Sequence, residues 1–200
     1  EQPEEPVPYP PNRKIYSAVG FYSRGYLWAR DEIQSTDLWE VREKTITNGR
    51  NYLCIYAIDI LRSVFSQFYK SFPGTAKLAL WDMSNQFGGK AAGHISHQNG
   101  LDIDVEYPYI DLPKKISNID FGHTFQLGRL FVATGKVSRM FVDARVKKML
   151  CKFGRSQWVT QDDLTTETLR RFRPYPLHHD HVHIRCKCDA SDAKCVDQVE

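Results

Sequence analysis

The feature that most constrains the fold is residues 93–106, which read GHISHQNGLDIDVE. Within this segment Leu101, Ile103 and Val105 alternate with Asp102 and Asp104. Strict alternation is typical of a half-buried β-strand, because successive side chains leave opposite faces of a sheet. We therefore predict a strand whose apolar side chains enter the core and whose two carboxylates share the open face.

A second alternating segment lies near the carboxyl end, where residues 178–188 read HHDHVHIRCKC. His181, His183 and Arg185 occupy alternate positions and predict another strand with one polar face. Two such strands can direct imidazole nitrogens and carboxylate oxygens at one divalent metal, for which zinc is the first candidate. Three protein ligands and a water make up a catalytic zinc site, because the open position is where water is activated.

The length and the composition indicate one globular domain. The 200 residues are 42% hydrophobic and carry a net charge of +3. This slight charge makes no case for nucleic-acid binding, and it does not hinder approach to an anionic polymer such as a cell wall. No apolar run reaches the roughly 18 residues of a transmembrane helix. The given sequence also begins without the charged and apolar regions of a secretion signal.

Residues 1–12 are rich in proline and predict a flexible tail, and residues 13–200 predict a single domain that contains the expected metal site. Apolar periodicity indicates a helix over residues 52–69 that ends at Pro73, with further helices over residues 124–134, after Asp143, and over residues 162–172. Short strands are predicted at residues 76–81 and 139–142. This mixture predicts an α+β fold with a central antiparallel sheet, flanking helices and the zinc site on the open sheet face.

The five cysteines are divided between the carboxyl end and the rest of the chain. Cys188 and Cys195 flank a short polar loop, which favours a disulfide formed in an oxidising compartment. A structural zinc site is the alternative, but Cys186 and Cys188 lack the usual two-residue gap. The count is odd, so at least one thiol is free or pairs with another chain. The pairing of Cys54, Cys151 and Cys186 is left open.

The two alternating segments together resemble the penicillin-insensitive murein endopeptidases. These zinc enzymes belong to a larger group with the lysostaphin-type peptidases, the D-alanyl-D-alanine dipeptidases and the hedgehog signalling domain. The group signature is His, six residues, Asp, and a distant His-x-His, here His97, Asp104 and the pair His181 and His183. The runs GHISHQNGLD and RMFVDARVKKMLC are similar to the endopeptidase branch, and the resemblance extends over most of residues 53–198.

The resemblance implies a set of metal ligands. His97, Asp104 and His183 match the zinc ligands of the family. His94 matches a further histidine of the site, which joins the metal or binds a second one. Asp120 and His123 match a peripheral metal site only loosely, because the intervening loop differs in length.

The resemblance also implies catalytic histidines. His181 matches the histidine beside the metal that assists catalysis, and His178 matches the position where other group members have a general base. One of them would accept the proton of the attacking water, and the other would stabilise the oxyanion. Asp180 occupies the place of a catalytic glutamate in the D-alanyl-D-alanine peptidases. Alternation directs it away from His183, so orientation of a histidine is its expected role.

Asp102 is expected to lie at the solvated rim or to accept a backbone hydrogen bond. Arg185 is expected either to bind a substrate carboxylate or to form a salt bridge on the strand face. Cys188 and Cys195 match a disulfide of the family.

Three functions remain in view. The first is a zinc murein endopeptidase that hydrolyses peptide cross-links in peptidoglycan, with the stem peptides as its substrate and a periplasmic or secreted location. The second is a D,D- or L,D-carboxypeptidase or dipeptidase that trims stem peptides. The third is a non-catalytic wall-binding domain that retains the metal. An endopeptidase needs a cleft open at both ends, whereas a carboxypeptidase needs a cationic stop; the sequence decides neither this point nor the oligomeric state.

Overall fold

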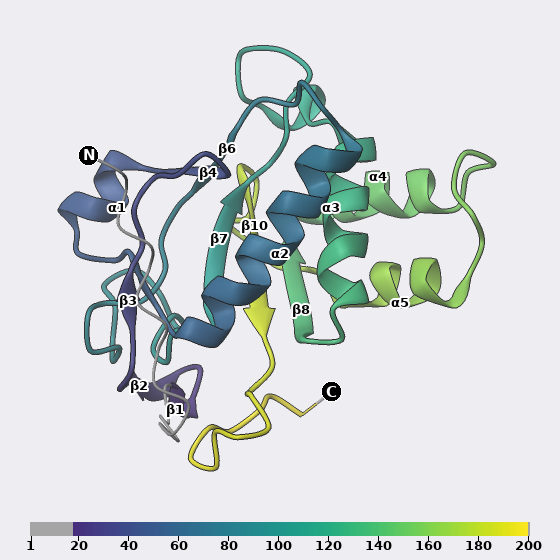
Figure 1. Ribbon diagram of the computed structural model, residues 1–200. Coiled ribbons are helices and arrows are strands. Elements are labelled where there is room, and N and C mark those ends of the chain that lie inside the picture. Colours follow the sequence, from purple (N-terminus) through teal and green to yellow (C-terminus); the bar gives the residue numbers. More distant parts are fainter. Residues whose placement is uncertain (1–17, 200) are drawn as a thin grey trace, which may run out of the picture.

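The two alternating segments form neighbouring central strands of a six-stranded sheet. The computed structural model describes residues 18–199, so the tail predicted at residues 1–12 and the first residues of the predicted domain lie outside it. Strands β7 (Asp102–Glu106) and β10 (His181–Cys186) pair antiparallel and place Asp104 directly opposite His183. This register joins residues separated by almost eighty positions, and Figure 1 shows the two strands side by side at the centre of the molecule.

The sheet has the strand order β4-β6-β7-β10-β8-β9. Its other members are β4 (Trp39–Val41), β6 (Leu78–Leu80), β8 (Val137–Val142) and β9 (Phe172–Pro174). The α+β class is confirmed, and the four middle strands are antiparallel as predicted. Both edge pairs, β4 with β6 and β8 with β9, are parallel, so the sheet as a whole is mixed around its antiparallel centre. In each edge pair helices carry the chain back to the same end of the sheet, which makes the second strand parallel to the first.

Helix α2 (Ile55–Ser71) covers one face of the central strands, with α3 (Phe121–Ala133) beside it (Figure 1). The buried side of α2 includes Ala57, Leu61, Val64 and Phe68, at the spacing of three and four residues that predicted the helix. The predicted start at Tyr52 is wrong, because residues 52 and 53 extend instead as β5 (Tyr52–Leu53) and pair with β3 (Asp31–Glu32).

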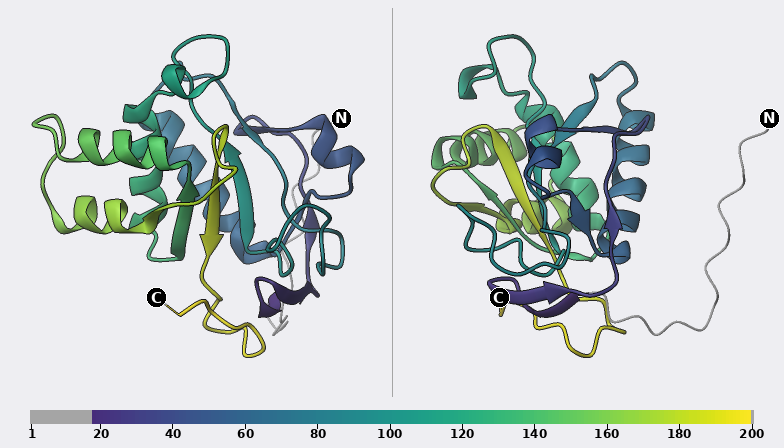
Figure 2. Two further views of the ribbon diagram at one scale, coloured as in Figure 1. Left: turned by 180° about the vertical axis from the view of Figure 1, so that it is seen from behind. Right: turned by 90° about the vertical axis from the view of Figure 1, so that its left-hand side faces the viewer.

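Helices α4 (Ala144–Gly154) and α5 (Asp163–Arg171) project from the far edge of the sheet, as the left view in Figure 2 shows. The side chains of Asp143 and Asp162 cap their first turns by accepting backbone hydrogen bonds. The remaining elements are a hairpin of β1 (Ala18–Phe21) and β2 (Arg24–Leu27), the short α1 (Glu43–Thr47) and a 3₁₀ turn at Ile116–Asn118. No helix within residues 18–199 has the length and apolar character of a membrane span.

Candidate metal centre

Strand β7 separates its side chains as alternation predicts. Ile103 and Val105 are fully buried in the core, while Asp102 and Asp104 lie on the other face. That face is not open, however, because Asp102 is 0% exposed and Asp104 is 2% exposed. The expectation that both carboxylates share an open face is therefore wrong. The loop that precedes β7 contributes His97, which is itself completely buried against this face.

The backbone of His97 has a left-handed conformation with φ of 63°, which is uncommon for a residue other than glycine. Two hydrogen bonds hold it there. Ser84 Oγ donates to the carbonyl oxygen of His97 over 2.7 Å, and the His97 backbone nitrogen donates to Asp102 Oδ2 over 3.1 Å. Strained backbone of this kind persists only where its surroundings constrain it, and here it fixes the imidazole beside Asp104.

Asp104 Oδ1 is the common neighbour of two imidazoles. It lies 3.4 Å from His97 Nε2 and 3.3 Å from His183 Nδ1. Tetrahedral zinc with bonds of about 2.0–2.2 Å separates its ligand atoms by about 3.3 Å. The spacing of these atoms therefore fits a shared metal ion.

The protonation of His183 follows from its contact with Asp102. Burial raises the pKa of Asp102, but Arg185 and His183 more than offset this and hold it well below its ordinary value, so the carboxylate is ionised and only accepts hydrogen bonds. His183 Nε2, at 2.7 Å from Asp102 Oδ1, must then carry the hydrogen. Burial lowers the pKa of His183 to about 4, which leaves a neutral ring whose Nδ1 lone pair faces Asp104.

Several buried polar atoms of this cluster have no hydrogen-bond partner. They are both ring nitrogens of His97 and Oδ1 of Asp104. A buried polar atom without a partner costs about 1–3 kcal/mol. His97 Nε2 and Asp104 Oδ1, which face each other at 3.4 Å, are suited to a divalent cation, since neutral imidazole and carboxylate are the ligand forms that metals require. The residues present therefore fit a metal such as zinc.

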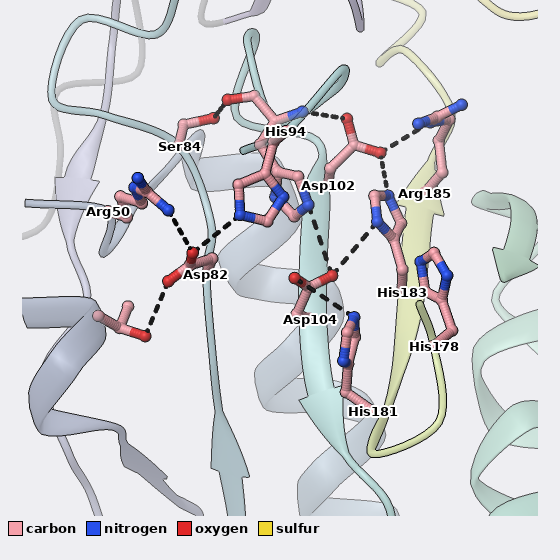
Figure 3. A network of polar contacts seen from close by, with 12 residues as sticks. Arg50, Asp82, Ser84, His94, Asp102, Asp104, His178, His181, His183 and Arg185 are labelled. Carbon is pink, nitrogen blue, oxygen red and sulfur yellow. Dashed lines mark hydrogen bonds and ion pairs between the residues drawn. The ribbon is translucent and has the colours of Figure 1, made fainter. Parts of the chain in front are cut away.

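His94 lies at the side of the cluster. Its ring is 4.6 Å from the ring of His97, and ligand atoms of His94, His97 and Asp104 lie within 4.8 Å of one another, a group that can hold a metal ion. Figure 3 shows His94 directed at Asp82, whose Oδ2 is 2.9 Å from His94 Nε2 and 2.7 Å from Arg50 Nη1. Burial by itself raises the pKa of Asp82, but the hydrogen bonds and charges of His94 and Arg50 lower it to about 2. The ionised Asp82 therefore fixes one nitrogen of His94.

The family model for penicillin-insensitive murein endopeptidases matches residues 18–121 and 114–200. The chain belongs to this family. Members named penicillin-insensitive murein endopeptidase from Escherichia coli (strain K12 / DH10B) and from Shigella boydii serotype 18 are 28% identical to it over 211 residues, which cover 90% of this chain and 70% of each relative.

In this member of the endopeptidase family, His181 faces Asp104 from β10. Its Nε2 is 3.6 Å from Asp104 Oδ2, and its Nδ1 is 2.8 Å from Asp180 Oδ1. Burial lowers the pKa of His181, but Asp104 and Asp180 raise it overall above its ordinary value. Asp180 thus orients a histidine, the role expected for it from alternation.

His178 lies next to His181, with their ring centroids 5.0 Å apart (Figure 3). Its Nδ1 is 2.7 Å from the carbonyl oxygen of Pro176 and donates to it, because a carbonyl only accepts. Burial, followed by the nearby charge of His181, lowers the pKa of His178. A neutral His178 with Nδ1 protonated has its acceptor nitrogen at Nε2.

Of the two roles expected for Arg185, the structure shows the salt bridge. Its Nε donates to Asp102 Oδ1 over 2.7 Å, both side chains are buried, and the guanidinium stacks over Tyr22 at 3.5 Å. Asp102 accordingly lies beneath the site, away from the rim. It does accept a backbone hydrogen bond, the alternative expected for it.

Asp120 and His123 are not part of the cluster. They contact each other at 2.7 Å, and Asp120 caps α3 by accepting from the backbone nitrogen of His123. The His123 ring packs against Phe72. Within residues 18–199 neither belongs to a group of three potential metal ligands.

The disulfide between Cys188 and Cys195 is present, as predicted. Cys54, Cys151 and Cys186 take no part in it.

Sequence reasoning missed three residues that support the site, namely Ser84, Asp82 and Arg50. None belongs to the histidine motifs, and each acts through a contact that the fold creates. The only available signal was the position of Asp82 and Ser84 in the glycine-rich loop that leads to His94.

Proposed function

We propose that the chain is a zinc metallopeptidase that hydrolyses the peptide cross-links of peptidoglycan. Membership of the endopeptidase family supports peptidase chemistry, and the names of the relatives support murein as the substrate. The observation that carries the proposal is the convergence of His97 and His183 on Asp104, whose Oδ1 is 3.4 Å from His97 Nε2 and 3.3 Å from His183 Nδ1.

His97, Asp104 and His183 are the proposed zinc ligands, through Nε2, Oδ1 and Nδ1. His94 can join them, because it offers a ligand atom within 4.8 Å of those of His97 and Asp104, and Asp82 holds its ring in place through Nε2. When bound, zinc acts as a Lewis acid that polarises the scissile carbonyl and brings the pKa of a water towards about 7.

The two remaining histidines divide the proton chemistry. His178, whose pKa is lowered, accepts the proton of the attacking water at Nε2 and returns it to the leaving amine. His181, whose pKa is raised and whose Nδ1 is held by Asp180, donates from Nε2 to the developing oxyanion. The disulfide and the wall substrate together favour a periplasmic or secreted location.

A chromatographic digest tests the proposal. Zinc-loaded protein is expected to convert cross-linked muropeptide dimers into monomers, and a chelator is expected to stop the reaction until zinc is restored. His183→Ala is expected to reduce both the zinc content and the hydrolysis to background, because it removes a ligand.

His179→Ala is the matched control, since His179 is a neighbouring histidine with a side chain 59% exposed. It should retain zinc and activity. Intact dimers in the presence of bound zinc would refute the endopeptidase function, and release of terminal residues alone would indicate a carboxypeptidase. Retention of the wall polymer without any cleavage would indicate a binding domain.

A further inference from the structure

An exposed arginine stands at the edge of the histidine cluster. Arg42 precedes α1, and its backbone nitrogen donates to the carbonyl oxygen of Leu80 over 3.0 Å, which places it beside the end of β6. Its guanidinium carbon lies 4.3 Å from the centre of the Trp81 ring. A guanidinium at this distance over an indole is held by a cation–π interaction.

Trp81 connects this cation to the site. Its backbone nitrogen donates to the carbonyl oxygen of Asp104 over 2.8 Å. Its ring lies 5.3 Å from the ring of His181, with the two planes tilted by 36°. A single indole therefore separates Arg42 from a histidine of the proposed catalytic pair.

Arg42 differs from the other arginines near the site in its electrostatic partners. Arg50 is paired with Asp82, and Arg185 is paired with Asp102. Arg42 is exposed and forms no ion pair with any residue in the part of the chain that the structure describes. Because one face of its guanidinium rests on Trp81, its N–H edge is available to a planar anion, and a carboxylate matches that edge bidentately.

We propose that Arg42, positioned by Trp81, binds a carboxylate of the substrate peptide next to His181. The inference rests on the proposed function, since it assigns the substrate of that same site as a stem peptide with a free carboxyl group.

Calorimetric binding to a stem peptide without a cross-link tests this proposal, because such a peptide lacks the cross-link that the proposed endopeptidase hydrolyses. The probes are the free peptide acid and the same peptide amidated at one carboxyl group at a time, each titrated into zinc-loaded protein. One amide is expected to bind about tenfold more weakly than the acid. Arg42→Gln should weaken binding of the acid by the same factor and should cause no further loss for that amide.

Two further variants separate recognition from general damage. Arg62→Gln is the matched control, because Arg62 is an exposed arginine on α2, and it should bind like the wild type. Arg42→Lys keeps the charge without the planar edge and should give an intermediate affinity. For cross-linked dimers Arg42→Gln should raise KM about tenfold and leave kcat and the zinc content unchanged.

Equal affinity of Arg42→Gln and the wild type for the acid would overturn the proposal. So would an equal loss for the acid and for every amide, or no binding of any of these peptides. Selective binding without hydrolysis of dimers would refute the proposed function and leave this carboxylate site standing. Hydrolysis of dimers together with binding that does not depend on Arg42 would support the proposed function and refute the carboxylate site.

Discussion

A single buried carboxylate, Asp102, holds two of the three proposed ligands. It accepts hydrogen bonds from the His97 backbone through one oxygen and from His183 and Arg185 through the other. Hydrogen bonds from a carboxylate to a ligating histidine fix the tautomer and the ring orientation. At this scale, the metal centre depends as much on the residues that hold the ligands as on the ligands themselves.

Asp82 should make stability depend on pH. Its pKa falls from 3.8 to about 2 in the folded protein, so its stabilising contribution is complete above about pH 4 and is lost as the pH falls through about 2. Asp82→Asn should cost about 2 kcal/mol of unfolding free energy at pH 7 and remove this acid dependence. Urea titrations between pH 2 and pH 7 would measure both effects.

Asp59→Asn is the control, because the Asp59 side chain is 64% exposed. It should show the acid dependence of the wild type. The same acid dependence in Asp82→Asn would show that its contacts with His94 and Arg50 do not stabilise the fold.

At the scale of elements, the turn into β7 sets the position of the His97 loop. Gly100 has φ of +76°, and a Cβ there would lie 2.6 Å from Leu27 Cδ1 and 2.9 Å from the Cys54 backbone nitrogen. The turn therefore requires glycine for its conformation and for its close contact with the start of α2. Because β7 begins directly after this turn, displacement here would move both Asp102 and His97.

Gly100→Ala should lower stability by more than Gly93→Ala. Gly93 also has a positive φ, +84°, but a Cβ there would meet no atom within 4 Å. Gly93→Ala should cost about 1–2 kcal/mol from its backbone conformation alone, and Gly100→Ala should cost about 1–3 kcal/mol more from the steric clash. Urea denaturation of both variants checks this, and equal losses would contradict the role of close packing at Gly100.

At the scale of the whole molecule, the carboxyl-terminal loop is tied to the first described strand. The Gly20 backbone nitrogen donates to the carbonyl oxygen of Lys194 over 2.8 Å, and the Gly20 carbonyl oxygen accepts from the Val196 backbone nitrogen over 3.0 Å. The Cys188–Cys195 disulfide closes this loop just after β10. The disulfide therefore supports the contact between β1 and the segment that follows β10.

Replacing Cys188 and Cys195 together by serine should lower the unfolding free energy by about 2–3 kcal/mol, because a short closed loop restricts the unfolded chain. Amide hydrogen exchange at Gly20 and Val196 should accelerate, while exchange in β7 should change less. Cys151→Ser is the control, since Cys151 lies outside the disulfide. Unchanged stability of the double variant would exclude a structural role for this disulfide.

Local patterns in the sequence determined the individual elements and the chemical nature of the site. Alternation identified β7 and β10, apolar periodicity identified α2, and the capping residue Asp143 identified the start of α4. The histidine motifs contained the three imidazoles that face the Asp104 carboxylate, those of His97, His181 and His183. Such signals are readable because they depend only on neighbours along the chain.

Only the tertiary structure decided how these elements meet. The opposition of Asp104 and His183, the burial of Asp102, the parallel edge strands and the extended conformation of Tyr52 all depend on partners far away in sequence. The same is true of Asp82 beneath His94 and of Arg42 on Trp81. The period of a strand determines which side chains share a face, but the register between strands and the loops packed over that face determine which of those side chains meet.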